Sequence, residues 1–564
     1  MHARYAVTFE RGISRHSVRE RASAAGLEIR IEKPSMLVLA DKQTPIVARG
    51  DRVIVGQIFD EDGHQADEPD AAFHGEDMAQ PAGFWGNFLL LSPGDLAPFV
   101  YRDPSGSIPA YEVNAEAGHF IVSDAELACS LGLLETPRLD LAFAVHWLQF
   151  PFLRTERTGI RDVRELLPGS ASRQAGGRWL RSAGWRPWNH VGPERRNGFD
   201  QLAEGLLRTT LKSVAAQVRG RSPLLQLSGG LDSSIVAASI ADGGIDFSSV
   251  TFASRSADGD ERRYAREVSK YFGSPLFEIL EDDLDRRIKA PNERKFRPGS
   301  NPVLAPLDEA IERVRQEAQS DLLVDGGGGD NLFCYLTGAA PVLDALRAAG
   351  LSQGLKAGND LAELTGSTLW GVAASSLRRA APAGWWRWKE DRRYLNREML
   401  LPSADRHPWL EGAEFSLPGK REHITALVHI QHFLDRRAAQ GSALLHPLMS
   451  EPLLDLCLSI PSWEWMRGGI DRAVARRAFQ DRLPPNVIDR RSKGSLQGMF
   501  HRFFAELSRD LRDLLLSGRL VALGIADART IERAFVDGDW EDDEVQMRLT
   551  EMASLDLWAQ SWRF

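Results

Sequence analysis

A short segment rich in serine and glycine, residues 228–234, follows the apolar run Leu224–Leu227. The apolar run predicts a buried parallel strand, and an apolar helical pattern begins near Ser233. Glycines at such a turn let the backbone approach a ligand closely, and the first turn of the helix offers N–H groups that suit a phosphate. The residues predicted to bind the phosphates are Leu227, Ser228, Gly229, Gly230, Leu231, Asp232, Ser233 and Ser234.

The segment differs from two other nucleotide-binding loops. It lacks the lysine of a Gly-x-x-x-x-Gly-Lys-Ser/Thr loop and the spacing of Gly-x-Gly-x-x-Gly. The carboxylate of Asp232 provides a hard oxygen ligand, which can hold a magnesium ion. A glycine-rich turn in an ordinary α/β domain is the alternative explanation.

A second glycine-rich segment, Asp325–Asp330, follows the apolar run that begins at Leu322. Four consecutive glycines carry a large entropic cost, which a loop lying flat against a ligand would explain. Its last residue, Asp330, is predicted to face a metal ion. A purely structural turn is the alternative here too.

Length and composition limit the classes of protein to consider. The chain has 564 residues, 26% of them charged and 43% hydrophobic, ordinary values for a soluble protein of two or three domains. A net charge of −9 gives no reason to expect nucleic-acid binding. The three cysteines are far apart, which suits a reducing cytoplasm. With no signal peptide and no apolar stretch long enough for a membrane span, we expect a cytoplasmic protein.

The first 195 residues differ in pattern from those that follow. Short alternating runs bounded by Gly, Pro and Asp predict strands, and their number favours a β-rich layered domain. These runs begin at Met36, Arg52, Gly86 and Phe99, and residues 173–186 predict a hairpin. We expect two domains, 1–195 and 196–564. The expected fold class is α+β followed by α/β, and the resemblance described next implies that the second domain is a doubly wound parallel sheet with added helices.

Both glycine-rich segments resemble those of known enzymes. Ser228–Ser233 resembles the pyrophosphate loop of ATP pyrophosphatases, which split ATP between the α and β phosphates and make adenylated intermediates. Asp325–Asp330 resembles a loop of asparagine synthetases, and so, in the same order along the chain, do the segments that begin at Asp260, Leu445 and Arg472. This resemblance covers about residues 80–500.

The resemblance to asparagine synthetases implies ATP and Mg²⁺ as cofactors. Asp232 and Asp330 become the expected magnesium pair, and Lys493 falls on the family's lysine over the phosphates, where an ammonium would stabilise the departing pyrophosphate. The three are the predicted catalytic residues. A solvated basic patch is the alternative for residues 490–493. Residues 249–253 predict a parallel strand on the adenine side of the pocket. The nucleotide-binding residues predicted outside the first loop are Phe252, Ala253, Asp325, Gly326 and Gly327.

The N-terminal part resembles class II glutamine amidotransferase domains, through Arg102–Tyr111 and Gly159–Gly169. Those domains use a cysteine exposed at the mature N-terminus as the nucleophile that attacks glutamine. Here His2 follows Met1, and the first cysteine is Cys129. Imidazole is a poor substitute for a thiolate. We therefore predict no glutamine hydrolysis, and a domain that acts as a scaffold or as a platform for a partner.

Departures from the related families bear on the substrate. β-Lactam synthetases also lack the cysteine and deprotonate their amine with a Tyr–Glu dyad, but Gly327 and Ala443 stand in the places of that dyad. A β-lactam synthetase mechanism is therefore disfavoured. Asparagine synthetase activity is disfavoured less strongly, because Gly327 also replaces a loop glutamate of that family and Leu445 replaces its arginine.

The second loop has glycine at all four positions 326–329, and the N-terminal cysteine is missing. In both features the chain resembles lasso peptide cyclases. These adenylate an Asp or Glu side chain of a ribosomal precursor peptide, whose N-terminal amine then closes a macrolactam. The resemblance implies a precursor peptide, a leader peptidase and a leader-recognition protein as partners. An asparagine synthetase-like small-molecule amide ligase using ammonia or another amine is the first alternative. A non-catalytic nucleotide-binding scaffold is the second.

A bound peptide requires a wide apolar cleft, and residues 341–408 are predicted to help form it. They include Trp370 and the aromatic and basic cluster Trp385–Lys389. Aromatic and arginine side chains favour recognition surfaces. A helical core filled by tryptophan is equally compatible with the pattern.

Overall fold

The computed structural model describes residues 3–9, 15–66, 83–94, 97–116, 118–192, 198–255, 260–291, 293–299, 301–380, 388–412, 417–434, 444–491 and 497–564. Several predictions therefore concern residues that lie outside the described part of the chain: His2, Trp385, Trp386, Ala443, Lys493 and the domain boundary at 195–196.

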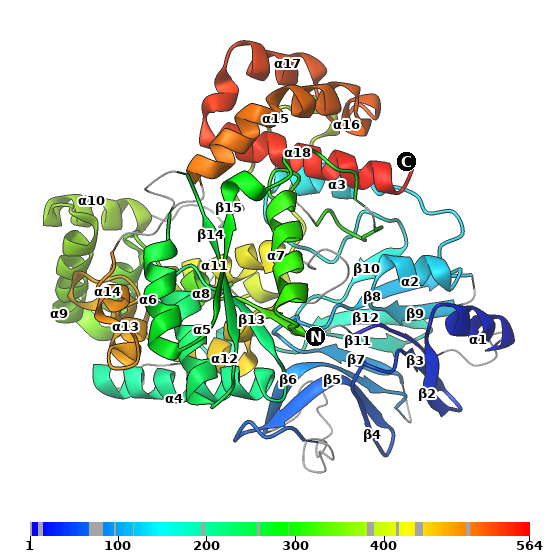
Figure 1. Cartoon of the computed structure of the whole chain (residues 1–564), viewed down its shortest axis with the longest axis horizontal. Coiled ribbons are helices and arrows are strands. Elements are labelled where there is room, and N and C mark those ends of the chain that lie inside the picture. Colours follow the sequence, from blue (N-terminus) through cyan, green and yellow to red (C-terminus); the bar gives the residue numbers. More distant parts are fainter. Residues whose placement is uncertain are drawn as a thin grey trace.

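Two antiparallel six-stranded sheets form the N-terminal part and lie in the lower right of Figure 1. The first has the order β10 (Val163–Glu165), β8 (Tyr111–Ala115), β9 (Gly118–Val122), β1 (Tyr5–Thr8), β3 (Met36–Ala40), β2 (Glu28–Lys33). The second has the order β12 (Arg178–Ala183), β11 (Ser170–Ala175), β7 (Phe99–Arg102), β6 (Phe84–Ser92), β5 (Arg52–Asp60), β4 (Ile46–Arg49).

Alternation along the strands explains why these sheets pack face to face. Val53 and Val55 of β5 lie in a buried cluster with residues of both sheets, whereas Ile54 and Ile58 lie in a separate cluster on the other face. The outer face of the first sheet packs against three helices, α1 (Arg15–Ala24), α2 (Ala125–Ser130) and α3 (Leu141–Gln149). The predicted β-rich layered domain is confirmed, as are the strands at Met36, Arg52, Gly86 and Phe99 and the hairpin β11–β12.

A parallel five-stranded sheet forms the centre of the remaining chain. Its order is β15 (Leu276–Leu280), β14 (Ser248–Ala253), β13 (Pro223–Gln226), β16 (Leu322–Val324), β17 (Leu444–Leu445). All four strand pairs are parallel, and the chain starts in the middle of the sheet and winds to both edges. The doubly wound parallel sheet predicted from the sequence is confirmed.

Helices cover both faces of this sheet, so its strands carry apolar residues on both sides. Leu225 of β13 packs in the cluster with α4 (Phe199–Val218), α5 (Leu231–Asp242) and α6 (Arg262–Phe272). Its neighbour Leu224 packs in the cluster that contains α7 (Ala305–Glu317). Figure 1 shows α5 and α6 on one side of the strands and α7 on the other.

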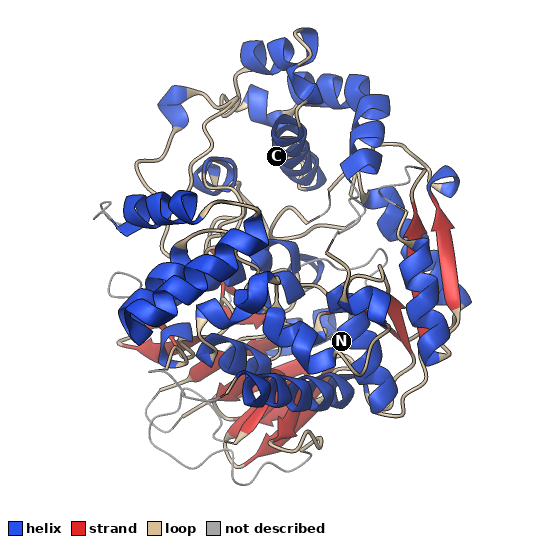
Figure 2. Cartoon of the chain, turned by 90° about the vertical axis from the view of Figure 1, so that its left-hand side faces the viewer, coloured by secondary structure: helices blue, strands red, loops and turns tan. Residues whose placement is uncertain are grey.

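The other helices extend the structure away from the sheet. They are α8 (Gly329–Leu332), α9 (Ala340–Thr365), α10 (Leu369–Ala380), α11 (Pro418–Leu434), α12 (Glu451–Ser459), α13 (Ala473–Phe479), α14 (Pro485–Ile488), α15 (Gln497–Ser517), α16 (Arg519–Ala522), α17 (Ala528–Val536) and α18 (Asp543–Ser561). Seen from the side, helices alone make up the top of the molecule, near the C-terminus (Figure 2). Among the described helices, none is long and apolar enough to cross a lipid bilayer.

A buried carboxylate joins the N-terminal part to the rest of the chain. Glu165 is fully buried and forms ion pairs with Arg102 (2.9 Å), Arg154 (2.5 Å) and Arg297 (2.8 Å). Burial alone would raise the pKa of Glu165, but the three guanidinium groups outweigh burial and lower it to about 2. Arg102 belongs to β7 and Arg297 to the loop before α7, so this cluster holds the two parts together.

The winding of the sheet determines where a ligand can bind. The two chain directions diverge between β13 and β16, and in open α/β sheets ligands bind at the carboxyl ends of the strands at such a switch point. Residues 227–230 leave β13 there, and residues 325–328 leave β16. The fold therefore brings together the two glycine-rich segments, which are about a hundred residues apart in sequence.

Candidate active site

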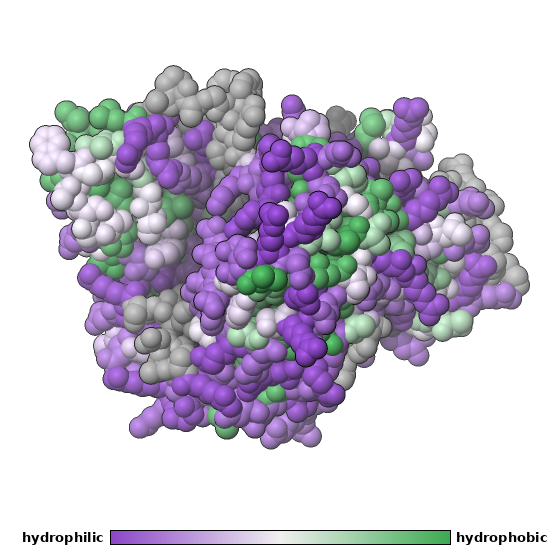
Figure 3. All heavy atoms as spheres, turned by 90° about the horizontal axis from the view of Figure 1, so that it is seen from above, coloured by the Kyte–Doolittle hydropathy of each residue, from purple (hydrophilic) through white to green (hydrophobic). Residues whose placement is uncertain are grey.

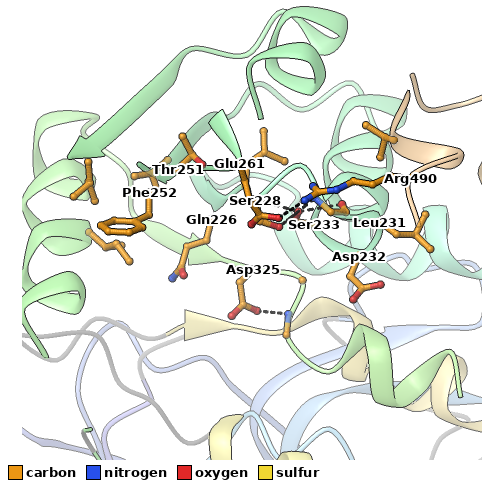
Figure 4. Close-up of a pocket in the computed structure, with 18 of the residues that line it drawn as sticks. Gln226, Ser228, Leu231, Asp232, Ser233, Thr251, Phe252, Glu261, Asp325 and Arg490 are labelled. Atoms are coloured by element: carbon orange, nitrogen blue, oxygen red, sulfur yellow. Dashed lines mark hydrogen bonds and ion pairs between the residues drawn. The ribbon is translucent and has the colours of Figure 1, made fainter. Parts of the chain in front are cut away.

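A cavity of about 290 Å³ opens at the carboxyl edge of the parallel sheet. Figure 4 shows Asp232 and Asp325 on one side of it and Glu261 and Arg490 on the other, with Phe252 at one end. Its lining residues are Gln226, Leu227, Ser228, Gly230, Leu231, Asp232, Ser233, Val250, Thr251, Phe252, Glu261, Ile279, Leu307, Ile311, Asp325, Gly326, Gly327, Arg472, Arg476, Val487 and Arg490. The lining thus combines polar and charged residues with apolar ones.

The first loop is fixed by its own hydroxyl groups. Ser228 Oγ lies 3.1 Å from Ser233 Oγ and accepts the Gly230 N–H at 3.2 Å. These two hydrogen bonds fix the conformation of the turn. Helix α5 begins at Leu231, two residues before the predicted start. Helix α5 has twelve residues, and the first of them line the cavity. Its N-terminus therefore presents N–H groups and a partial positive charge to a ligand there.

Close packing explains the glycines of both loops. Gly229 has φ +70°, and a Cβ there would collide with the Cβ of Tyr264. A Cβ on Gly326 would lie 2.6 Å from the Ser233 nitrogen, and one on Gly329 would lie 2.5 Å from Asp232 Cγ. The second loop therefore lies directly against the first, and only glycine permits this approach.

Both carboxylates of the predicted magnesium pair contact the side chain of Arg472. Arg472 Nη1 lies 3.1 Å from Asp232 Oδ1 and 2.5 Å from Asp330 Oδ1. Burial would lower the pKa of this guanidinium, but Asp232, Asp330 and Asp471 raise it overall. Arg472 has φ +51° at the residue before α13, a conformation that non-glycine residues adopt at a cost of about 1–3 kcal/mol. The two carboxylates thus share one positively charged partner at the cavity wall.

A second arginine closes the opposite wall. Arg490 pairs with Glu261 at 2.8 Å, and its guanidinium lies 4.0 Å from the ring centroid of Tyr264. Its side chain is only 7% exposed, so it does not belong to a solvated basic patch. Arg476 holds the backbone at Arg490 in place, because its guanidinium donates to Asp471 and to the Arg490 carbonyl oxygen, each at 2.9 Å.

The structure brings most of the predicted nucleotide-binding residues to one cavity. Ten of them line it: Leu227, Ser228, Gly230, Leu231, Asp232, Ser233, Phe252, Asp325, Gly326 and Gly327. Four predicted residues are not among the lining set: Gly229, Ser234, Ala253 and Asp330. Ser234 is fully buried, and Asp330 reaches the site through Arg472. Lys493 lies outside the described residues, two positions after Arg491.

Sequence reasoning missed a histidine next to this site. His446 follows β17, and its Nδ1 lies 2.7 Å from Asp325 Oδ1, which also accepts the Gly327 N–H at 2.8 Å. A Cβ on Gly327 would lie 2.7 Å from the same ring nitrogen. The imidazole therefore occupies the space beside Gly327. The available signal was its position, since it ends an apolar strand at the edge where Ser228 and Asp325 end theirs.

A second cavity of about 220 Å³ lies next to the first, on the other side of Asp325. Gln226, Ile311, Asp325 and Gly327 line both cavities, and the second adds the residues Asp308, Leu323, Ile430, Phe433, Leu434, Leu444 and His446. Phe433 in turn borders a third cavity of about 340 Å³. That one is lined by Trp147, Pro298, Gly299, Asn301, Leu304, His432, Phe433, Gln497, Phe500, Asp543, Met547, Glu551 and Ser554. Three cavities thus follow one another from the parallel sheet to helices α3, α15 and α18.

The segment predicted to form a peptide cleft lies elsewhere. No described residue between 341 and 408 lines any of the three cavities. Trp370 of α10 is 86% exposed, and Trp388 donates its indole N–H to the Pro151 carbonyl oxygen at 2.9 Å. Apolar atoms gather at the end of the molecule that α9 and α10 form, at the left of Figure 3.

None of the three cysteines has the properties of an activated nucleophile. Burial raises the pKa of the Cys129 and Cys457 thiols and raises that of Cys334 to about 12. A thiol must lose its proton to attack an amide, so these side chains are inert. Cys129 lies on α2.

Comparison with known proteins begins with weak likenesses. No curated protein matches the chain. Among solved structures, it is similar to an allosteric regulatory enzyme of purine biosynthesis, at 9% identity and a TM-score of 0.19, over 57% of this chain and 89% of that one. A glutamine phosphoribosylpyrophosphate amidotransferase from B. subtilis with ADP and GMP gives 10% identity and a TM-score of 0.19, over 57% and 90%. Scores this low support no argument about fold or function.

A match to a protein family is far more extensive. The model of the family described as asparagine synthase matches residues 205–560, well over half of the chain. The matched range contains the parallel sheet, both glycine-rich loops and every residue that lines the first cavity. The chain therefore belongs to the asparagine synthase family and is an ATP-dependent amide-forming ligase in its general class of activity.

Proposed function

We propose that this chain is a lasso peptide cyclase. It adenylates an Asp or Glu side chain of a ribosomal precursor peptide with ATP and joins that carbonyl group to the peptide's N-terminal amine. The observation that carries the proposal is the row of three neighbouring cavities, in which each shares at least one lining residue with the next. A ligase for a free amino acid and ammonia needs a small closed acceptor pocket, whereas a peptide needs an extended one.

The first cavity has the properties of an ATP site. Ser228, Ser233 and the N-terminus of α5 suit phosphate groups, and the apolar residues Val250 and Phe252 suit a base. A loop of this kind, without a phosphate-binding lysine of its own, supports cleavage to AMP and pyrophosphate. We propose that Lys493, in the segment after Arg490, stabilises the leaving pyrophosphate.

The carboxylates near Arg472 fit a magnesium ion. Asp232 and Asp330 contact the same guanidinium and so face a common position for positive charge. Magnesium is commonly held by one or two carboxylates together with substrate phosphates. When bound, the ion would neutralise phosphate charge.

The third cavity suits a peptide. Trp147, Phe433, Phe500 and Met547 give it an apolar wall, and Asp543 and Glu551 add negative charge. Aromatic and flexible apolar side chains adapt to peptide surfaces, and carboxylates attract a protonated N-terminal amine. We propose that the core of the precursor occupies this space, and that a leader peptidase and a leader-recognition protein act with the enzyme in the cytoplasm.

The experiment is direct. Purified enzyme, ATP, Mg²⁺ and a leader-cleaved precursor, together with any partner peptidase, are incubated and analysed by mass spectrometry. The expected product has lost one molecule of water, and fragmentation places a ring between the N-terminus and an Asp or Glu side chain. If the peptide is unchanged while aspartate and ammonia yield asparagine, the small-molecule ligase replaces this proposal. Absence of any ATP-dependent product with either substrate favours the non-catalytic scaffold.

A further inference from the structure

His446 lies on one side of the proposed adenylation site only. His446 lines the second cavity and not the first, whereas Asp325 and Gly327 line both. Gly326, in the same loop, packs against Ser233 of the phosphate loop. A single layer of glycine backbone therefore separates the imidazole from the loop that suits the phosphates. An amine that attacks from the second cavity would therefore lie beside His446.

Resting on the proposed function, we propose that His446, held by Asp325, takes the proton from the attacking amine. Related amide-forming enzymes need a group for this step, and the imidazole fills the space that a side chain at position 327 would occupy. Imidazole is the usual proton acceptor near neutral pH. No other histidine lines the first or second cavity among the described residues.

The hydrogen bonds of the ring suit this role. Among the described residues, two acceptor atoms lie beside the ring: Asp325 Oδ1 at 2.7 Å from Nδ1, and the Leu434 carbonyl oxygen at 3.0 Å from Nε2. In the neutral ring, Nδ1–H donates to Asp325 and Nε2 has a lone pair. Once Nε2 has gained a proton, it can donate to Leu434, and the Asp325 carboxylate compensates the new charge.

The step balances without a further reagent. The amine nitrogen forms a bond to the carbonyl carbon of the acyl adenylate, and the bond from that carbon to the phosphate oxygen breaks, so that AMP leaves with the electron pair. An arriving ammonium gives its first proton to Nε2 of His446, which releases it to solvent, and the nitrogen loses its second proton to solvent as the amide forms. Asp308 of α7 also lines the second cavity and adds negative charge that attracts an ammonium before it is deprotonated.

Three variants distinguish a role of His446 in proton transfer from a purely structural role. His446→Asn retains an N–H donor for Asp325 but has no basic nitrogen, His446→Ala removes both, and Asp325→Asn weakens the hold on the ring. The control is His64→Asn, since His64 forms a similar pair with Asp60 at 3.4 Å and is 71% exposed. Each is assayed for macrolactam formation and for hydroxamate formation with hydroxylamine, a weakly basic amine that attacks without losing a proton first.

We expect both His446 variants to form hydroxamate within about threefold of the wild-type rate, while macrolactam formation falls about 10²-fold or more. The fall in macrolactam rate at low pH should be present in the wild type and absent in His446→Asn. Equal losses of hydroxamate and macrolactam, or a wild-type cyclisation rate in His446→Asn, would overturn the inference. Wild-type enzyme that forms neither product would instead refute the proposed function.

Discussion

Arg472 Nη1 lies 2.5 Å from Asp330 Oδ1, although the two residues belong to different loops and are 142 positions apart. The contact couples the second glycine-rich loop to the segment before α13. It also keeps Asp330 next to Asp232, because the same nitrogen reaches both carboxylates. The expected magnesium pair is therefore preorganised by a cation of the protein itself.

Replacing Asp330 tests that pair. Asp330→Asn should lower the rate of pyrophosphate release by about 10²–10³-fold and raise the Mg²⁺ concentration needed for half-maximal activity. The reason is the loss of one hard anionic ligand beside the phosphates. Asp321→Asn is the matched control, since Asp321 lies at the opposite end of β16 and pairs with Arg221 at 2.7 Å on the surface. An unchanged Mg²⁺ dependence in Asp330→Asn would contradict the assignment.

The arginine opposite the carboxylates should matter for ATP binding. Arg490→Ala removes a buried guanidinium that joins Glu261 to the loop carbonyl of Gly229. We expect the KM for ATP to rise about tenfold or more, since hydrogen bonds to charged groups contribute about 1.5–3 kcal/mol. Arg477→Ala, at an exposed pair with Asp200, should leave the KM unchanged. Similar KM values for the two variants would show that Arg490 does not belong to the ATP site.

The glycines of the second loop give a steric prediction. Gly329→Ala would put a Cβ 2.5 Å from Asp232 Cγ and should displace that carboxylate, so ATP-dependent turnover should fall at least tenfold while the far-UV spectrum stays the same. Gly205→Ala is the control. Gly205 lies within α4, where an added Cβ would meet no atom within 4 Å, and alanine there should stabilise the helix by about 0.5–1 kcal/mol. Full activity in Gly329→Ala would refute the close approach of the loops.

Acid should weaken the junction between the two parts of the chain. Because the pKa of Glu165 is lowered from 4.5 to about 2, its ionised form contributes stability that is fully present above pH 4.5 and is lost as the pH falls towards 2. Glu165→Gln should destabilise the protein by about 3–5 kcal/mol at neutral pH, because three arginines lose their buried partner. It should also lack this part of the acid dependence.

Urea unfolding at several pH values measures both effects. Glu32→Gln is the control, since Glu32 pairs with Arg19 on the surface and such a pair contributes less than about 1 kcal/mol. If Glu165→Gln and Glu32→Gln destabilise the protein equally, the three ion pairs at Glu165 do not hold the parts together.

Local patterns in the sequence were sufficient to predict the elements that carry the site. Apolar runs that break at glycine predicted β13 and β16 and their loops, and the resemblance to known enzymes implied the doubly wound parallel sheet. His446 escaped prediction because its meaning depends on β17 lying beside β16, a tertiary relationship that no local pattern encodes. The third cavity escaped for the same reason, since Trp147 and Met547 meet there although they are far apart along the chain.

The central claim is that ATP activates a side-chain carboxylate as an acyl adenylate. A precursor peptide labelled with a heavy oxygen isotope in its Asp and Glu side chains tests it most directly. After cyclisation by the wild-type enzyme, mass spectrometry of the nucleotide and phosphate products locates the label. We predict that AMP carries one labelled oxygen and that pyrophosphate carries none. A labelled inorganic phosphate accompanied by ADP would contradict the account.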